Sequence, residues 1–171
     1  ERAFGALMFV FAVPNVIPTP PGTSAVLGLP LLFLTYQLMV GRQTIWLPQR
    51  IAQRLVSGDL LAAFTRRALP WLVKTETVLK PRLPLLVRND MAERVLGFVC
   101  FLLSVVLFLP IPFGNILPAL SISVLALALA ERDGLAALLG YVLAGAGIAL
   151  LALVSSAIWA GLQAFFNTLF G

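Results

Sequence analysis

The chain alternates long apolar runs with short polar or proline-rich interruptions. Two apolar stretches, residues 3–40 and 95–130, are each broken near the middle by prolines and a glycine. A charged turn at residues 131–134 and a further apolar stretch at 135–170 follow the second of them. Apolar runs of this length predict helices, and the prolines predict where those helices stop.

The two broken stretches carry the same spaced residues, 92 positions apart. The pattern Glu-Arg-x2-Gly-x12-Pro-x-Pro-x-Gly begins at Glu1 and again at Glu93. In each copy the prolines remove backbone donors, and the glycine allows the chain to reverse. A duplicated and interrupted apolar element of this kind indicates the functional centre of a membrane protein.

The arms of each repeat are too short to cross a bilayer comfortably. About 15 helical residues span roughly 22 Å, whereas the hydrocarbon core is about 30 Å thick. We therefore expect two re-entrant helix–break–helix hairpins, whose tips meet each other or water because lipid cannot satisfy exposed backbone groups. Short, tilted crossings are the alternative. Hairpins that return to their starting side favour one shared orientation of the repeats over an inverted pair.

The predicted fold is an all-α integral membrane protein with a single membrane domain. Its predicted parts are repeat one (1–41), a basic amphipathic linker (42–92), repeat two (93–134) and a C-terminal membrane segment (135–171). In that last part Leu135–Ile158 is long enough to span a bilayer, and its small residues suit helix packing within the chain or in a homo-oligomer. We expect Trp159–Phe170 to turn back or to lie at the far interface.

Composition and charge agree with a membrane protein. Of 171 residues, 60% are hydrophobic and 11% are charged, which is too apolar for a soluble domain. Most of the twelve basic residues lie between Arg42 and Arg94, so the positive-inside rule predicts a cytoplasmic linker. Its amphipathic stretches predict an interfacial segment on anionic lipid headgroups, with no nucleic-acid partner. A small soluble cap is the alternative.

The residue types for common active sites are few. The chain has no histidine and a single cysteine, Cys100, inside an apolar run. Its seven carboxylates are scattered along the chain. Acid–base catalysis and most metal sites require groups that converge. We therefore expect no enzyme activity, no catalytic residue, no metal and no cofactor.

Polar residues and glycines beside the two breaks form the candidate substrate site, where helix N-termini would face an anion. They are Asn15, Gly22, Thr23, Ser24, Gly114 and Asn115. The repeated ion pairs form a candidate gate at the mouth of the cavity: Glu1, Arg2, Glu93 and Arg94. The alternative for both sets is structural, with the asparagines capping freed backbone groups and the pairs complementing helix starts.

Several distinctive strings resemble the ExoD family over nearly the whole chain. They are ERAFGAL (1–7), PNVIPTPPGTSAVLGLP (14–30), GRQTIWLP (41–48), KPRLP (80–84), PIPFGNILPA (110–119) and ERDG (131–134). The resemblance implies a multi-pass protein of the bacterial inner membrane associated with exopolysaccharide production, and carries over no catalytic residue. The family's usual N-terminal extension is absent before Glu1, so upstream residues are expected. By architecture alone, the hairpins also resemble DedA-type lipid transporters.

The functional expectation is a transporter or lipid-translocation protein that supports exopolysaccharide synthesis or export. Its cavity at the two breaks would take an anionic substrate such as a polyprenyl-phosphate headgroup. The alternatives are a non-transporting membrane scaffold for polysaccharide-synthesis enzymes and an ion or proton transporter.

Overall fold

A computed structural model describes residues 2–17, 22–42, 44–46, 89–109 and 114–170, together with single positions between 66 and 87. In these ranges every element of regular secondary structure is a helix, which confirms the all-α class. Most of the predicted basic linker, 42–92, lies outside the described residues. The elements are α1 (Arg2–Ala12), the 3-10 helix η1 (Val13–Val16), α2 (Thr23–Val40), α5 (Asp90–Phe108), α6 (Ile116–Glu131) and α7 (Gly134–Phe170).

Both first arms end where the sequence predicts a break. Ile17 follows η1 with φ −88° and ψ 134°, and Leu109 follows α5 with φ −74° and ψ 129°, so both residues are extended. Each precedes a proline, and the proline ring excludes the helical conformation of the residue before it. The equivalent prolines therefore end the first arm of each repeat.

The second arms begin differently from one another. Gly22 precedes α2 with φ 110°, a conformation that favours glycine. Gly114 is not among the glycines with positive φ in the described ranges. Gly22 takes the N-cap position of α2, and Asn115 takes that of α6 without a side-chain capping bond.

The helices pack across the two repeats. α1 lies against α6, and α2 lies against α5, in the most extensive contacts of the bundle apart from α6 with α7. A β-carbon at Gly5 would lie 2.6 Å from the Ala126 carbonyl oxygen. One at Gly97 would lie 2.5 Å from the Met39 backbone nitrogen. The glycine after each Glu-Arg pair thus allows a first arm to approach the other repeat's second arm at backbone distance.

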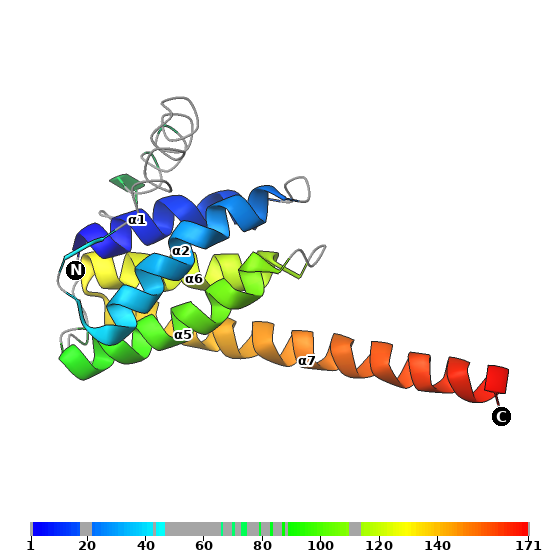
Figure 1. Cartoon of the computed structure of the whole chain (residues 1–171). Coiled ribbons are helices and arrows are strands. Elements are labelled where there is room, and N and C mark those ends of the chain that lie inside the picture. Colours follow the sequence, from blue (N-terminus) through cyan, green and yellow to red (C-terminus); the bar gives the residue numbers. More distant parts are fainter. Residues whose placement is uncertain are drawn as a thin grey trace.

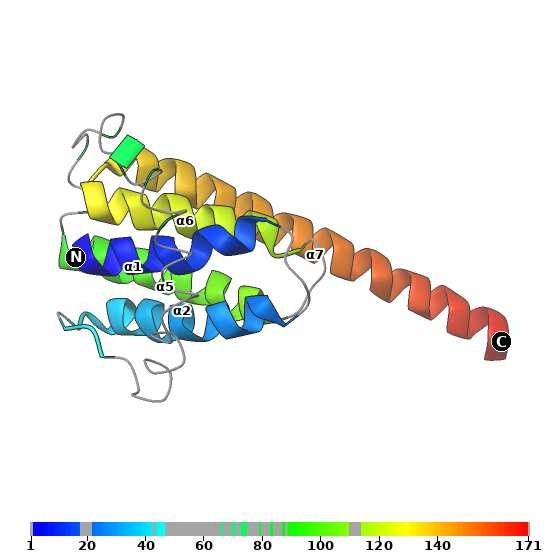
Figure 2. The ribbon, with the colours of Figure 1, turned by 90° about the horizontal axis from the view of Figure 1, so that it is seen from above.

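The helix pair α1–α2 and the helix pair α5–α6 have the same orientation in the bundle (Figures 1 and 2). α1 and α5 run away from the end of the bundle near the N-terminus, and α2 and α6 run back to it. We call that end, with residues 2–4, 38–42, 89–94 and 131–133, the charged end. The break end is the opposite one, with residues 15–17, 22, 107–109 and 114–118. Both breaks therefore lie at one end of the molecule.

Buried hydroxyl groups are satisfied inside this packing. The Thr35 hydroxyl donates to the Leu31 carbonyl, 2.8 Å away, and lies 3.4 Å from the hydroxyl of Ser104 on α5. The Ser121 hydroxyl donates to the Gly140 carbonyl, 2.8 Å away, and so joins α6 to α7. The apolar core between the helices is thus held with few polar defects.

α7 is one uninterrupted helix that extends past the break end (Figure 1). Its first half packs on α6, whereas almost all side chains from Ile148 to Leu169 are exposed. The alternative that Trp159–Phe170 turns back is wrong for this structure. By length and apolar composition α5 and α7 could each cross a membrane, and α1, α2 and α6 are shorter apolar helices.

Candidate functional site

The charged end is organised by the way α2 stops. Gly41 adopts a left-handed conformation with φ 80°, and its N–H donates to the Leu38 carbonyl, 3.0 Å away. The Arg42 N–H donates to the Gln37 carbonyl, 2.9 Å away. This is the glycine-dependent motif that closes many helices. It directs the chain out of the bundle at Arg42.

A side-chain amide fixes the path that follows. The Gln37 Nε2 group donates to the Trp46 carbonyl at 2.6 Å, and the Trp46 N–H donates to Gln37 Oε1 at 2.7 Å. Gln37 is buried in α2. Its amide both donates to and accepts from the backbone of Trp46, as the backbone of a neighbouring strand would. The residues between 37 and 46 that the structure describes are thereby positioned at the charged end.

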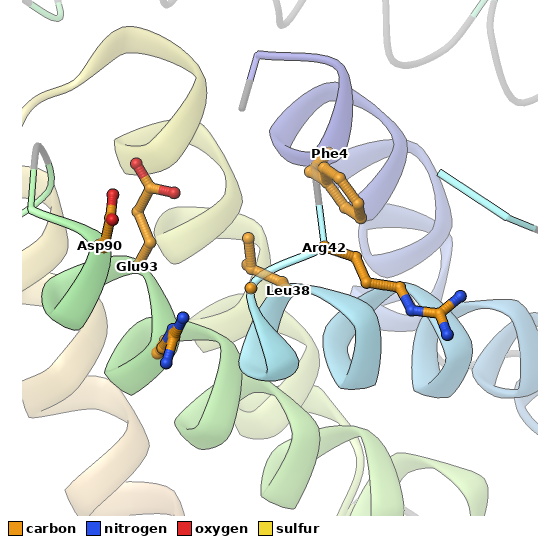
Figure 3. A pocket seen from close by; sticks show the side chains of 7 residues that line it. Phe4, Leu38, Arg42, Asp90 and Glu93 are labelled. Atoms are coloured by element: carbon orange, nitrogen blue, oxygen red, sulfur yellow. The ribbon is translucent and has the colours of Figure 1, made fainter. Parts of the chain in front are cut away.

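A pocket of about 490 Å³ opens beside this turn. Its lining mixes charged and apolar residues and is supplied by three helices and the turn after α2: Phe4, Leu38, Gly41, Arg42, Asp90, Glu93 and Arg94. Figure 3 shows Asp90 and Glu93 together on one side of Leu38, and Arg42 on the other. Two arginines and two carboxylates thus line the pocket, and the Arg42 side chain extends away from the carboxylates.

The first turn of α5 explains the two carboxylates. Asp90 and Glu93 lie next to the helix N-terminus, where the aligned backbone dipoles stabilise negative charge. Asp90 and Arg94 are four residues apart and so lie on one face of α5. The mixture of charges is therefore fixed by the helix itself.

Arg94 lies directly over Gly41. A β-carbon at Gly41 would be 2.9 Å from Arg94 Nε and 3.1 Å from an Arg94 terminal nitrogen. The guanidinium also lies next to the C-terminal end of α2, where backbone carbonyls favour a cation. Gly41 is thus needed for both the turn and the seat of the guanidinium.

The predicted gate residues are divided by the structure. Glu93 and Arg94 both line the pocket. Arg2 is exposed at the start of α1 and is not among the described residues of the lining, and Glu1 lies outside the described residues. Two residues that sequence reasoning did not select, Arg42 and Asp90, complete the charged rim.

The corresponding corner of the second repeat is filled differently. The Arg132 backbone is left-handed, with φ 55°, at the end of α6. Asp133 follows, and its Oδ1 accepts hydrogen bonds from the N–H groups of Leu135, at 2.9 Å, and Ala136, at 3.4 Å. The carboxylate thus caps α7 and is buried. Where repeat one has Gly41 and Arg42, repeat two has Asp133 and Gly134, so the corner becomes a helix start.

The predicted substrate residues lie at the break end. Asn15 is buried, with 3% of its surface exposed, whereas Gly114 and Asn115 are half-buried and Gly22 is exposed. The side chains of Thr23 and Ser24 lie outside the described part. The structure therefore separates the predicted substrate residues from Glu93 and Arg94 by the length of the bundle.

Both asparagines have a structural role at the break end. The Asn15 Nδ2 group donates to the Phe11 carbonyl at 2.9 Å, and the Asn115 Nδ2 group donates to the carbonyls of Leu107 and Leu109, both at 3.3 Å. Each amide therefore satisfies carbonyls near the end of a first arm, as the structural alternative predicted. Within the described ranges, no group of three or more metal-ligating side chains converges.

The fold is that of an all-helical protein with two helices of the length and apolar composition of membrane spans, a charged pocket at one end and two helix breaks at the other. The family described as "Exopolysaccharide synthesis, ExoD" matches residues 1–153, so the chain belongs to the ExoD family, as the sequence strings predicted.

Two relatives agree with this assignment. The chain is 30% identical over 168 residues to an uncharacterized protein of Synechocystis sp., a match that covers 98% of this chain and 76% of that one. It is also 30% identical over 145 residues to Protein ExoD of Rhizobium meliloti, covering 82% of this chain and 60% of that one. No solved structure matches the chain.

Proposed function

We propose that the chain is an integral membrane protein that binds the phosphate headgroup of a lipid in the charged pocket and supports exopolysaccharide synthesis by moving that lipid or presenting it. The observation that carries the proposal is the pocket beside Gly41, whose lining combines Arg42 and Arg94 with Phe4 and Leu38. Its family, named for exopolysaccharide synthesis, supplies the process. Lipid-linked phosphates are amphiphiles of the kind that such a pocket fits.

The chemistry of the rim favours a single phosphate group. A guanidinium group can bind two phosphate oxygens at once, and the Arg94 guanidinium lies over Gly41. The two arginines and the two carboxylates of the lining have a formal net charge of zero. Asp90 and Glu93 would therefore repel a ligand with several negative charges. Phe4 and Leu38, which are almost fully buried, are the apolar side chains of the pocket lining.

The register of α6 on α7 supports re-entrant hairpins. A β-carbon at Gly147 would lie 3.5 Å from Leu117 Cβ, so the start of α6 lies beside Gly147. Gly147 is roughly 20 Å from the start of α7, at 1.5 Å per residue, and α7 continues for roughly 34 Å more. With the charged end at one membrane surface, the breaks would lie inside a core about 30 Å thick. α7 would complete the crossing.

The test is binding of a radiolabelled polyprenyl phosphate to the purified full chain in nanodiscs. Arg94→Gln is expected to weaken binding about tenfold, which corresponds to about 1.4 kcal/mol. Arg2→Gln is the matched control, because it changes the sequence-equivalent arginine, which is not among the described residues of the pocket lining. Its affinity is expected to stay within twofold of the unmodified chain.

The carboxylates give a test of opposite sign. Asp90→Asn removes a negative charge from the rim and is expected to tighten lipid-phosphate binding severalfold, more at low salt than at high salt. A pocket that binds cations would respond in the reverse order. Equal binding by Arg94→Gln and the unmodified chain would remove the proposed headgroup site.

A further inference from the structure

Three charged side chains of the pocket are not paired with one another. Asp90 and Arg94 are four residues apart on α5 with the acid first, which is the arrangement that favours an ion pair along a helix. Among the described residues, no ion pair joins these two side chains, and none joins Arg42 to a carboxylate. All three side chains are exposed. The pocket therefore presents open charges of both signs.

Two helix ends keep the opposite charges apart. Asp90 lies in the first turn of α5, where the aligned backbone dipoles stabilise a negative charge. The Arg94 guanidinium lies over Gly41, at the C-terminal end of α2, where the dipoles stabilise a positive charge. Each charge is thus stabilised without the other, and their separation follows from the packing of α2 against α5.

The balance of charge limits what the pocket can bind. Because the two arginines and two carboxylates of the lining cancel, the empty pocket has no formal net charge. A phosphate alone would add negative charge beside Asp90 and Glu93, and a cation alone would add positive charge beside Arg94. A ligand with one charge of each sign leaves the filled pocket neutral, since each of its charges can lie near an opposite one.

The pocket has room for two charged groups and an acidic side for one of them. Its volume of about 490 Å³ lies within the range of small-molecule sites, roughly 300–1,000 Å³. Figure 3 shows the carboxylates of Asp90 and Glu93 together on one side of Leu38, apart from Arg42. A phosphate bound to an arginine therefore leaves the acidic side for a positively charged group of the same ligand.

We infer that the pocket binds a lipid headgroup in which a short link joins the phosphate to a primary ammonium group. The phosphate lies at Arg94, and the ammonium donates hydrogen bonds to Asp90 and Glu93. The inference rests on the proposed function for the phosphate, and it adds the amine that defines the substrate class. Phosphatidylethanolamine has this chemistry, and so has a polyprenyl phosphate that carries an amino sugar.

The test is equilibrium binding of radiolabelled dihexanoyl phosphatidylethanolamine to the full chain in detergent, with uptake by empty micelles subtracted. The matched probe is the same lipid with its amine acetylated, which keeps the phosphate and the link but removes the positive charge. The unmodified chain is expected to bind the amine lipid about fivefold more tightly than the acetylated lipid, and the difference should shrink at high salt.

Asp90→Asn is the informative variant. It is expected to weaken binding of the amine lipid severalfold without weakening binding of the acetylated lipid, which is the reverse of its expected effect on polyprenyl phosphate. Glu131→Gln is the matched control, because it removes a carboxylate at the same end of the bundle that is not among the described residues of the lining. It should bind both lipids normally, and melting temperatures show that both variants fold.

A third probe distinguishes the two sources of the headgroup. Polyprenyl phosphate linked to glucosamine is measured beside phosphatidylethanolamine, and the tighter ligand identifies the source. Either result supports the inference if Asp90→Asn weakens binding of that ligand.

Equal affinity of the unmodified chain for the amine and acetylated lipids overturns the inference, as does an Asp90→Asn chain that binds the amine lipid no more weakly. The phosphate site is tested separately on the same probes. Arg94→Gln should weaken binding of both lipids, and unchanged binding of both would remove the proposed function while the comparison of the two lipids still decides the amine site.

Discussion

Glycines decide how closely the helices of this protein meet. Gly5 and Gly97 lie at equivalent places in the two repeats, and each faces backbone atoms of the opposite repeat's second arm. No side chain can rotate away from such a contact. Gly145 also lies inside a long apolar helix, α7, yet a β-carbon there would meet nothing within 4 Å in the described part of the chain.

Gly97→Ala is therefore expected to separate α2 from α5 and to destabilise the fold by about 1–3 kcal/mol. Gly145→Ala is the matched control, and should be neutral or stabilising by up to about 1 kcal/mol because alanine favours helix. Thermal unfolding in one detergent compares the two. A Gly97→Ala chain that unfolds at the same temperature as Gly145→Ala would contradict the close contact.

Gly41 links backbone conformation to the pocket. Gly41→Ala places a methyl group at a left-handed position and within 2.9 Å of Arg94 Nε, so the guanidinium must move. We expect weaker polyprenyl-phosphate binding than in the unmodified chain. In the Arg94→Gln background the same change should have no further effect on binding, and a double-mutant cycle measures this coupling. Additive losses would show that Gly41 acts independently of Arg94.

Individual residues also show where sequence reasoning stopped. Glu93 and Arg94 could be selected because their pair is repeated, but Arg42 and Asp90 are not part of the repeat. Their proximity depends on the packing of α2 against α5, which no local pattern specifies. The mismatch between Gly41-Arg42 and Asp133-Gly134 was readable in the sequence, and it marks the repeat whose corner carries the pocket.

At the scale of helices, the ends were predictable and the partners were not. Ile17 and Leu109 precede prolines, and that local rule ends α1 with η1 and α5. The pairing of α1 with α6 and of α2 with α5 depends on surfaces that are distant in sequence. Each helix is apolar on nearly all sides, so the sequence does not show which face packs against which partner. The hydrogen bonds of the asparagines are local, to carbonyls four to eight residues earlier, and the sequence offered them as the structural alternative.

α7 divides into a packed half and an exposed half, and the halves should differ in their contribution to stability. Truncation after Trp159 removes residues whose described side chains are exposed, so the melting temperature in detergent should change by no more than about 2 °C. Leu125→Ala, at a fully buried position that packs beside Gly140, should instead cost about 2–5 kcal/mol. A large loss on truncation would show that the exposed half stabilises the bundle.

At the scale of the molecule, the two ends differ in chemistry. The charged end has a pocket lined by arginines, carboxylates and two apolar side chains, and the break end has the buried amide oxygens of two asparagines. The helices between them pack through apolar side chains and satisfied hydroxyls. The proposed headgroup site belongs to the charged end alone.

The central claim is that the helix breaks lie inside the bilayer while α7 crosses it, and cysteine labelling from each side tests this directly. Cys100 is buried and is first replaced by alanine. Single cysteines at Val40, Ile17 and Trp159, all exposed, then report the charged end, the break end and the far part of α7. A membrane-impermeant maleimide should label Val40→Cys and Trp159→Cys from opposite faces, and should not label Ile17→Cys from the face that exposes Trp159→Cys. Rapid labelling of Ile17→Cys from that face would mean that the arms cross the membrane, and would contradict the account.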